Sequence, residues 1–142
     1  MTKNESPAVA VGLNRRASRK YSAINARGGA ISIGDGSDAS FTPVELLLAA
    51  LAGCSAIDVD QATSRHQSLR HFQVTASAVK QQDGDGNKLG DLQVRFNLEF
   101  DDTLEGVAAQ AILPRAVEIS HAKLCTVSRT IEAGERVRME VV

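Results

Sequence analysis

The chain has 142 residues, enough for one domain with its own hydrophobic core, and we expect residues 1–142 to form a single domain in which residues 1–7 are a flexible tail. Its 16 basic and 17 acidic side chains nearly cancel, which argues against nucleic acid or an anionic membrane as a partner. No apolar run reaches the roughly 20 residues of a membrane span, and the first residues lack the apolar segment of a secretory signal. We therefore expect a cytoplasmic protein, in which a disulfide between the only two cysteines would be transient and chemical.

The first third of the chain predicts three short strands, which are residues 8–13, 21–26 and 30–34. Between the first two, residues 14–19 form a strongly basic connecting loop with three arginines, Arg15, Arg16 and Arg19. Arg27-Gly28-Gly29 is typical of a tight turn between the second and third strands, because glycine readily supplies positive φ. A polar, flexible link at residues 34–40 follows.

A well-marked helix start comes next. Thr42 can cap the free backbone amides, Pro43 suits the first helical position, and Glu45 can return a hydrogen bond to the cap. From Val44 to Val59 the helix is apolar on nearly every side, so we expect it to be buried all round. Small residues beside Cys54 would let another backbone approach closely, from the same chain or from a partner; they are Ala49, Ala50, Ala52 and Gly53.

The rest of the chain contains stretches with the two-residue period of strands and stretches that are typical of helices. Residues 72–78 and 92–100 alternate apolar and polar side chains and predict a hairpin that turns at residues 83–87. Residues 104–119 predict a helix with a kink or restart at Pro114, and a short helix should run from about Cys125 to Gly134. Val137, Met139 and Val141 alternate with charged residues and predict a last strand. This order predicts an α+β fold with helices packed on a mostly antiparallel sheet.

The two cysteines are the residues with the clearest chemical potential, although their spacing alone does not pair them. A single cysteine in an apolar helix is usually an inert small hydrophobe, which is the simplest interpretation of Cys54. Cys125 lies near the expected start of a helix, where the helix dipole and free amides favour a thiolate. Because 71 residues separate them (125 minus 54), only the fold could bring the two sulfur atoms together.

Two segments carry a resemblance to a known family. Residues 42–59, TPVELLLAALAGCSAIDV, resemble the central-helix motif of the OsmC/Ohr family of osmotically inducible and organic hydroperoxide resistance proteins. Residues 116–128, AVEISHAKLCTVS, resemble the second cysteine region of the same family, and the order of the elements agrees over nearly the whole chain. The resemblance implies an OsmC-like fold, with mostly antiparallel sheet wrapped around a long buried central helix. It also implies an intertwined homodimer with active sites at the subunit interface.

The resemblance further implies a thiol-dependent peroxidase that needs no cofactor or metal. Cys54 would attack an organic hydroperoxide and become a sulfenic acid, and Cys125 would resolve it to a disulfide. An external dithiol, for example of the lipoyl type, would restore the thiols. A buried thiolate needs a counter-charge, and of Arg15, Arg16 and Arg19 in the matching region we favour Arg16.

Two carboxylates near this site leave alternatives open. In the peroxidases of the family a glutamate that orients the arginine directly follows the proline, but here Val44 holds that place. Glu45 comes one residue later, so it either takes part in the site or only caps the helix. Asp58 lies on the same helix face as Cys54 and would oppose thiolate formation unless it points elsewhere or is itself paired.

Two other functions remain alternatives to the peroxidase. The first is a non-catalytic binding or structural protein that holds a hydrophobic ligand in an apolar groove at the dimer interface. The second, a metal or hydrolytic site with His121 and Cys125, is weaker because the sequence offers no third ligand or orienting group. The three histidines, His66, His71 and His121, are expected to be surface or ordinary polar residues.

Overall fold

The computed structural model describes residues 6, 8–64 and 69–142, and the chain divides into two compact units. The N-terminal unit extends to Leu46, and the C-terminal unit begins at Leu47, inside helix α1 (Pro43–Thr63). That the whole chain forms one domain stays a prediction. Within the described ranges, every helix is too short or too polar to span a bilayer.

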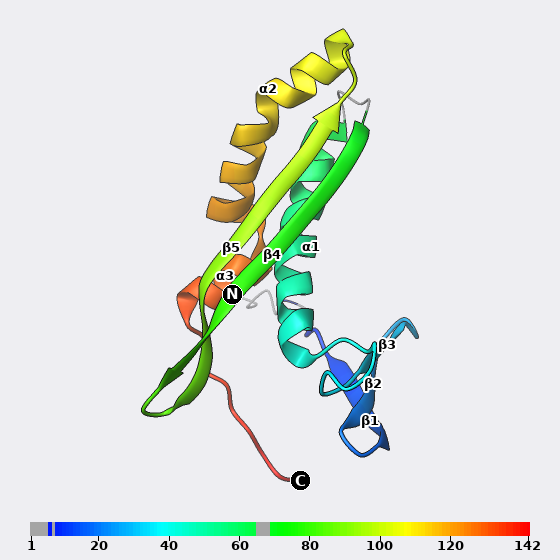
Figure 1. Cartoon of the computed structure of the whole chain (residues 1–142), viewed down its shortest axis with the longest axis vertical. Coiled ribbons are helices and arrows are strands. Elements are labelled where there is room, and N and C mark those ends of the chain that lie inside the picture. Colours follow the sequence, from blue (N-terminus) through cyan, green and yellow to red (C-terminus); the bar gives the residue numbers. More distant parts are fainter. Residues whose placement is uncertain (1–5, 7, 65–68) are drawn as a thin grey trace, which may run out of the picture. The chain divides into compact units, whose positions relative to one another are not determined.

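The N-terminal unit is built on an antiparallel three-stranded sheet in the order β1-β2-β3 (Figure 1). The strands are β1 (Val11–Ala17), β2 (Lys20–Asn25) and β3 (Ala30–Ile33). The predicted turn between β2 and β3 is confirmed. Asn25 Oδ1 accepts hydrogen bonds from the amides of Arg27 (3.0 Å) and Gly29 (2.9 Å), and Gly28 has a φ of 86° that favours glycine.

The basic segment is not the loop that the sequence predicts, because Arg15 and Arg16 lie inside β1. This strand begins at Val11 and extends to Ala17, and its pairing with β2 shifts register between Arg15 and Ala17. β1 is an edge strand of the sheet, where charged side chains are well tolerated because they reach solvent and discourage further strand pairing. Only Ser18 and Arg19 remain as the turn, and Arg19 adopts a φ of 58°.

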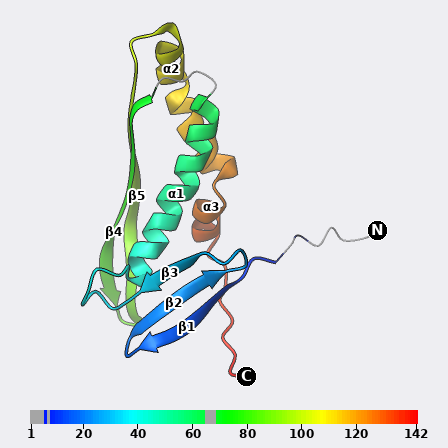
Figure 2. The same cartoon turned by 90° about the vertical axis from the view of Figure 1, so that its right-hand side faces the viewer.

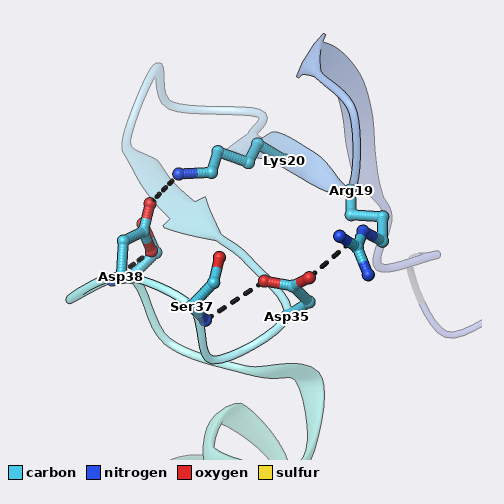
Figure 3. A network of polar contacts seen from close by, with 6 residues as sticks. Arg19, Lys20, Asp35, Ser37 and Asp38 are labelled. Carbon is cyan, nitrogen blue, oxygen red and sulfur yellow. Dashed lines mark hydrogen bonds and ion pairs between the residues drawn. The ribbon is translucent and has the colours of Figure 1, made fainter.

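Ion pairs hold the polar link after β3, although its sequence predicts a flexible segment (Figure 3). Arg19 Nε lies 3.2 Å from Asp35 Oδ2, and the Lys20 ammonium pairs with the Asp38 carboxylate. Hydrogen bonds from Ser37 hold the pKa of Asp35 below its ordinary value, and Lys20 lowers the pKa of Asp38 to about 2. Arg19, one of the three candidate arginines, therefore has an anionic partner in its own unit.

The predicted helix start is confirmed as a reciprocal cap. The Thr42 amide donates to Glu45 Oε2 (2.8 Å), and the Glu45 amide donates to Thr42 Oγ1 (3.3 Å). Pro43 then opens α1. This pair satisfies two backbone donors that the first turn of a helix would otherwise leave free. Glu45 thus has a structural role in the N-terminal unit. Capping of the helix is one of the two alternatives that the sequence leaves open for this residue.

The C-terminal unit packs helices on one face of a long hairpin, as Figure 2 shows. Strands β4 (Leu69–Asp83) and β5 (Gly86–Phe100) pair in antiparallel register, which confirms the predicted hairpin. Beyond it come α2 (Leu104–Ile119), the π-helix η2 (Ser120–Leu124) and α3 (Thr126–Ala133). The α2 bounds match the prediction, and α3 ends at Gly134, whose left-handed φ of 65° caps it as expected.

The core of the C-terminal unit lies between the inward side chains of β5 and the helices. Its buried members are Val59, Leu98, Phe100, Ala109 and Ala116. On α1 only one stripe at four-residue spacing is buried, namely Leu51, Ser55, Val59 and Thr63. The chain by itself therefore does not bury the helix all round as the sequence predicts, and Ile57 keeps 69% of its surface exposed.

The prediction of a last strand near the C-terminal end is wrong for this chain. Residues 135–142 form no strand, and the apolar side chains of the alternating pattern, Val137, Met139 and Val141, are 80% exposed or more. A strand is stable only when its backbone amides and carbonyls find a neighbouring strand. Within the described residues, this segment has no such neighbour, so the alternation alone does not produce a strand.

Candidate functional site

The two cysteines meet where the middle of α1 comes close to the start of α3, within the C-terminal unit. Cys54 lies on α1 next to the buried stripe and is partly exposed, whereas Cys125 is completely buried. Both are free thiols. The two side chains lie close enough for each to influence the ionisation of the other, so the fold brings together two residues that are 71 positions apart.

Cys125 occupies the N-cap of α3, and the local chain path explains why its sulfur points back at the helix. After η2, the Cys125 amide donates to the Ser120 carbonyl (2.8 Å), and the backbone leaves helical geometry with a ψ of 98°. The sulfur then accepts a hydrogen bond from the Ser128 amide (3.4 Å), three residues into the helix. A cysteine here takes the place of the serine or aspartate oxygen that usually caps a helix.

The groups around the pair favour negative charge on Cys125. The Ser55 hydroxyl donates to Cys125 Sγ at 3.5 Å. Burial opposes ionisation of Cys125, but the hydrogen bonds from Ser55 and the Ser128 amide, together with the nearby Cys54 thiol, outweigh it and bring the pKa of Cys125 below its ordinary value. Burial raises the pKa of the Cys54 thiol, and the nearby Cys125 raises it further.

Asp58 has a hydrogen-bond partner of its own. Its Oδ2 accepts a bond from the Ser120 hydroxyl at 2.8 Å, across from α1 to η2. The Asp58 carboxylate therefore has a hydrogen-bond partner. This is one of the two conditions under which Asp58, on the same helix face as Cys54, would not oppose thiolate formation. The same contact ties α1 to the turn that precedes Cys125, and so helps to fix the two cysteines in place.

The remaining predicted site residues belong to the N-terminal unit. Arg15 and Arg16 lie on β1, Arg19 pairs with Asp35, and Glu45 caps α1. Their roles beside the thiols stay predictions.

Two histidines, His71 and His121, lie in the described part of the C-terminal unit. His71 Nε2 lies 3.4 Å from the Asn97 amide nitrogen, and His121 Nε2 lies 2.7 Å from Glu132 Oε1 at an exposed position. His66 lies outside the described residues. Among the residues that the structure describes, no three His, Cys, Asp or Glu side chains cluster closely enough to hold a metal ion. Within the described ranges, a metal site with His121 and Cys125 thus has no third ligand of these types.

Sequence reasoning missed the two serines that contact the buried sulfur. Ser55 directly follows Cys54, and Ser128 stands three residues after Cys125. The distance of three residues from Cys125 to Ser128 is the N-cap to N3 spacing of a helix, so Ser128 could have been predicted once Cys125 was taken as the cap. The position of Ser55 gave no such signal, because Ser55 reaches Cys125 only through the packing of α1 on α3.

The protein thus has an α+β fold in which helices cover one face of an antiparallel hairpin. Its two thiols lie close together between these helices. The sequence profile of the family described as OsmC-like protein matches residues 34–140. The chain therefore belongs to the OsmC-like family. An uncharacterized protein of Mycobacterium tuberculosis is 30% identical over 133 residues, which are 92% of this chain and 93% of the relative.

Solved structures agree on the fold. An OsmC-like protein of unknown function from Vibrio cholerae has a TM-score of 0.73 at 14% identity, covering 89% of this chain and 95% of that one. A protein from Legionella pneumophila described as organic hydroperoxide resistance protein OsmC, a predicted redox protein, has a TM-score of 0.59 at 17% identity, covering 89% and 91%. At these identities the likeness concerns the fold, and the mixed α+β architecture with antiparallel sheets is confirmed.

Proposed function

We propose that this protein reduces organic hydroperoxides with its two thiols. The single observation that supports the proposal most is the proximity of Cys54 and Cys125, because two thiols that lie near each other in the fold can close a disulfide. Membership of the OsmC-like family adds to it, since solved relatives of the same fold include organic hydroperoxide resistance proteins.

The proposed cycle has three balanced steps. The Cys54 thiolate attacks the terminal peroxide oxygen, the O–O bond breaks, and the leaving alkoxide takes a proton to become an alcohol. Cys125 then attacks the sulfur of the Cys54 sulfenic acid, forming the disulfide and releasing water. An external dithiol reduces the disulfide through a mixed disulfide and is itself oxidised. Cys54 takes the first role because it is partly exposed, whereas Cys125 is completely buried and suits the second.

One equivalent of cumene hydroperoxide should convert the reduced protein to an intramolecular Cys54 to Cys125 disulfide. The intact mass should fall by about 2 Da, because the two thiols lose two hydrogen atoms. Tryptic mapping then identifies the crosslinked peptides, and protein whose thiols were alkylated beforehand is the control. A protein that remains a free dithiol after this treatment would contradict the proposal and favour a non-catalytic binding protein.

The proposed enzyme is a homodimer, because the exposed side of α1 has the character of an interface. Ile57 and Leu47 are apolar and keep 69% and 41% of their surface exposed. Within the described residues, a Cβ added at Gly53 would meet no atom within 4 Å, so the helix surface beside Cys54 is open to another backbone. A second copy of the chain would cover both features.

Light scattering at micromolar concentration should give twice the chain mass of 15.1 kDa. Ile57→Glu should shift the mass toward that of the monomer, because it places a charge in the proposed interface. Ile31→Glu is the matched control, since Ile31 is also exposed but lies on β3, away from α1 in the sequence. A monomeric wild-type protein would contradict the dimer.

A further inference from the structure

The C-terminal unit contains a pocket of about 400 Å³ whose lining includes neither cysteine. Apolar side chains of β5 and of the helices line most of it; they are Leu51, Leu92, Val94, Phe96, Val117 and Ile131. All lining residues belong to this one unit, and the volume falls within the usual range for small-molecule sites. The pocket therefore has the size and the lining of a binding site for an organic molecule.

One buried hydroxyl in the pocket wall lacks a partner. Ser128 is 8% exposed, and its Oγ makes no hydrogen bond with any residue that the structure describes. The hydroxyl lies beside Cys125 Sγ and helps to lower the pKa of that thiol, but their geometry is not that of a hydrogen bond. Burial of a hydroxyl without a partner is unfavourable, so this oxygen is available to a ligand. The other deep polar residues of the wall, Ser55 and Ser120, already donate to Cys125 and Asp58.

The charges at the pocket select against a charged ligand. His121 and Glu132 are the ionisable residues of the lining, and they pair with each other at 2.7 Å on its exposed side. A carboxylate or ammonium group on a ligand would lose its hydration inside the apolar wall without gaining an opposite charge. An uncharged molecule with one polar group would lose far less hydration free energy on binding.

We propose that this pocket binds an uncharged organic molecule that has an apolar body and a single hydroxyl group, and that this hydroxyl bonds to Ser128 Oγ. The ligand donates its hydroxyl proton to Ser128 Oγ, and its body fills the space between β5 and the helices. The binding needs no oxidation of either cysteine, so it goes beyond the proposed peroxide reduction and can be measured separately from it.

Two matched probes test the proposal on the reduced full-length protein. 2-Phenyl-2-propanol has the hydroxyl, and isopropylbenzene has the same apolar body without it. Titration followed by methyl NMR should shift the signals of Leu92 and Val94 and leave that of Ile31 on β3 unchanged. The alcohol should bind about five- to tenfold more tightly than the hydrocarbon, as expected for one net hydrogen bond. Failure of the alcohol to bind, or equal affinity for the two probes, would overturn the proposal.

Three variants complete the test. Ser128→Ala removes the hydroxyl but keeps the backbone amide that bonds to Cys125, and should remove most of the preference for the alcohol while leaving hydrocarbon binding unchanged. Thr130→Ala on the exposed side of the same helix is the control and should behave like wild type. Val94→Phe should weaken the binding of both probes by filling the pocket. Alcohol binding that neither Ser128→Ala nor Val94→Phe changes would place the probe elsewhere and overturn the proposal.

Discussion

The two single-cysteine variants should respond in opposite ways to one equivalent of cumene hydroperoxide. In Cys125→Ser, the partly exposed Cys54 remains to react, and its sulfenic acid should accumulate because no second thiol condenses with it. Dimedone should therefore label Cys54 in nearly all molecules after a single turnover. In Cys54→Ser, the remaining thiol is completely buried, so peroxide consumption should fall by roughly 1,000-fold or more, as it does when other enzymes lose their nucleophile.

Accessibility and acidity point to different cysteines, which is why this comparison is informative. Ser55, the Ser128 amide and Cys54 together lower the pKa of Cys125, while burial raises that of Cys54. If acidity decided the reaction, Cys54→Ser would form a dimedone adduct at Cys125 faster than Cys125→Ser forms one at Cys54. That result would exchange the proposed roles of the two residues. The double variant should give no adduct, and circular dichroism shows whether each variant is folded.

Local patterns were sufficient for most elements of the fold. The helix start at Thr42 and the end of α3 at Gly134 follow from residues that each stabilise one backbone geometry, a reciprocal cap and a left-handed residue. The β4–β5 hairpin follows from the two-residue alternation. Such signals depend on neighbouring residues only, so the sequence carries them without knowledge of the tertiary structure.

The errors concern features that depend on distant partners. Alternation at Val137, Met139 and Val141 predicts a strand, but a strand also needs a neighbour, which the alternation does not supply. Likewise, the apolar surface of α1 predicts burial all round, whereas one chain covers only a single stripe. A second copy of the chain would provide what both features lack, which is consistent with the proposed homodimer.

The candidate site, too, could be predicted from the sequence only in part. Resemblance to a family paired Cys54 with Cys125, although their spacing alone gave no reason to pair them. The serines that bond to the buried sulfur became visible only through the packing of α1 on α3. The π-helix before Cys125, which leads the chain into the cap of α3, was not predicted from the sequence.

Removal of the relevant arginine should raise the pKa of Cys54 and slow peroxide consumption. The thiol needs this help because burial raises its pKa, and the hydrogen bonds from Ser55 and the Ser128 amide favour negative charge on Cys125 instead. A guanidinium beside Cys54 would favour the thiolate and donate hydrogen bonds to the peroxide oxygens. Arg16→Ala should therefore slow the reaction by roughly 100-fold, the usual loss when one stabilising donor is removed from an active site.

The sign of the pH effect separates a counter-charge from a merely structural arginine. A raised Cys54 pKa leaves less thiolate at neutral pH, so the rate of the Arg16→Ala protein should recover as the pH rises, whereas a folding defect would not be corrected in this way. Arg15→Ala and Arg19→Ala identify the residue; Arg19 is the weaker candidate because Asp35 already pairs with it. Arg27→Ala, in the turn after β2, removes the same charge elsewhere in the unit and should leave the rate unchanged. Wild-type rates in all three single variants and in the triple variant would exclude an arginine of this segment as the counter-charge.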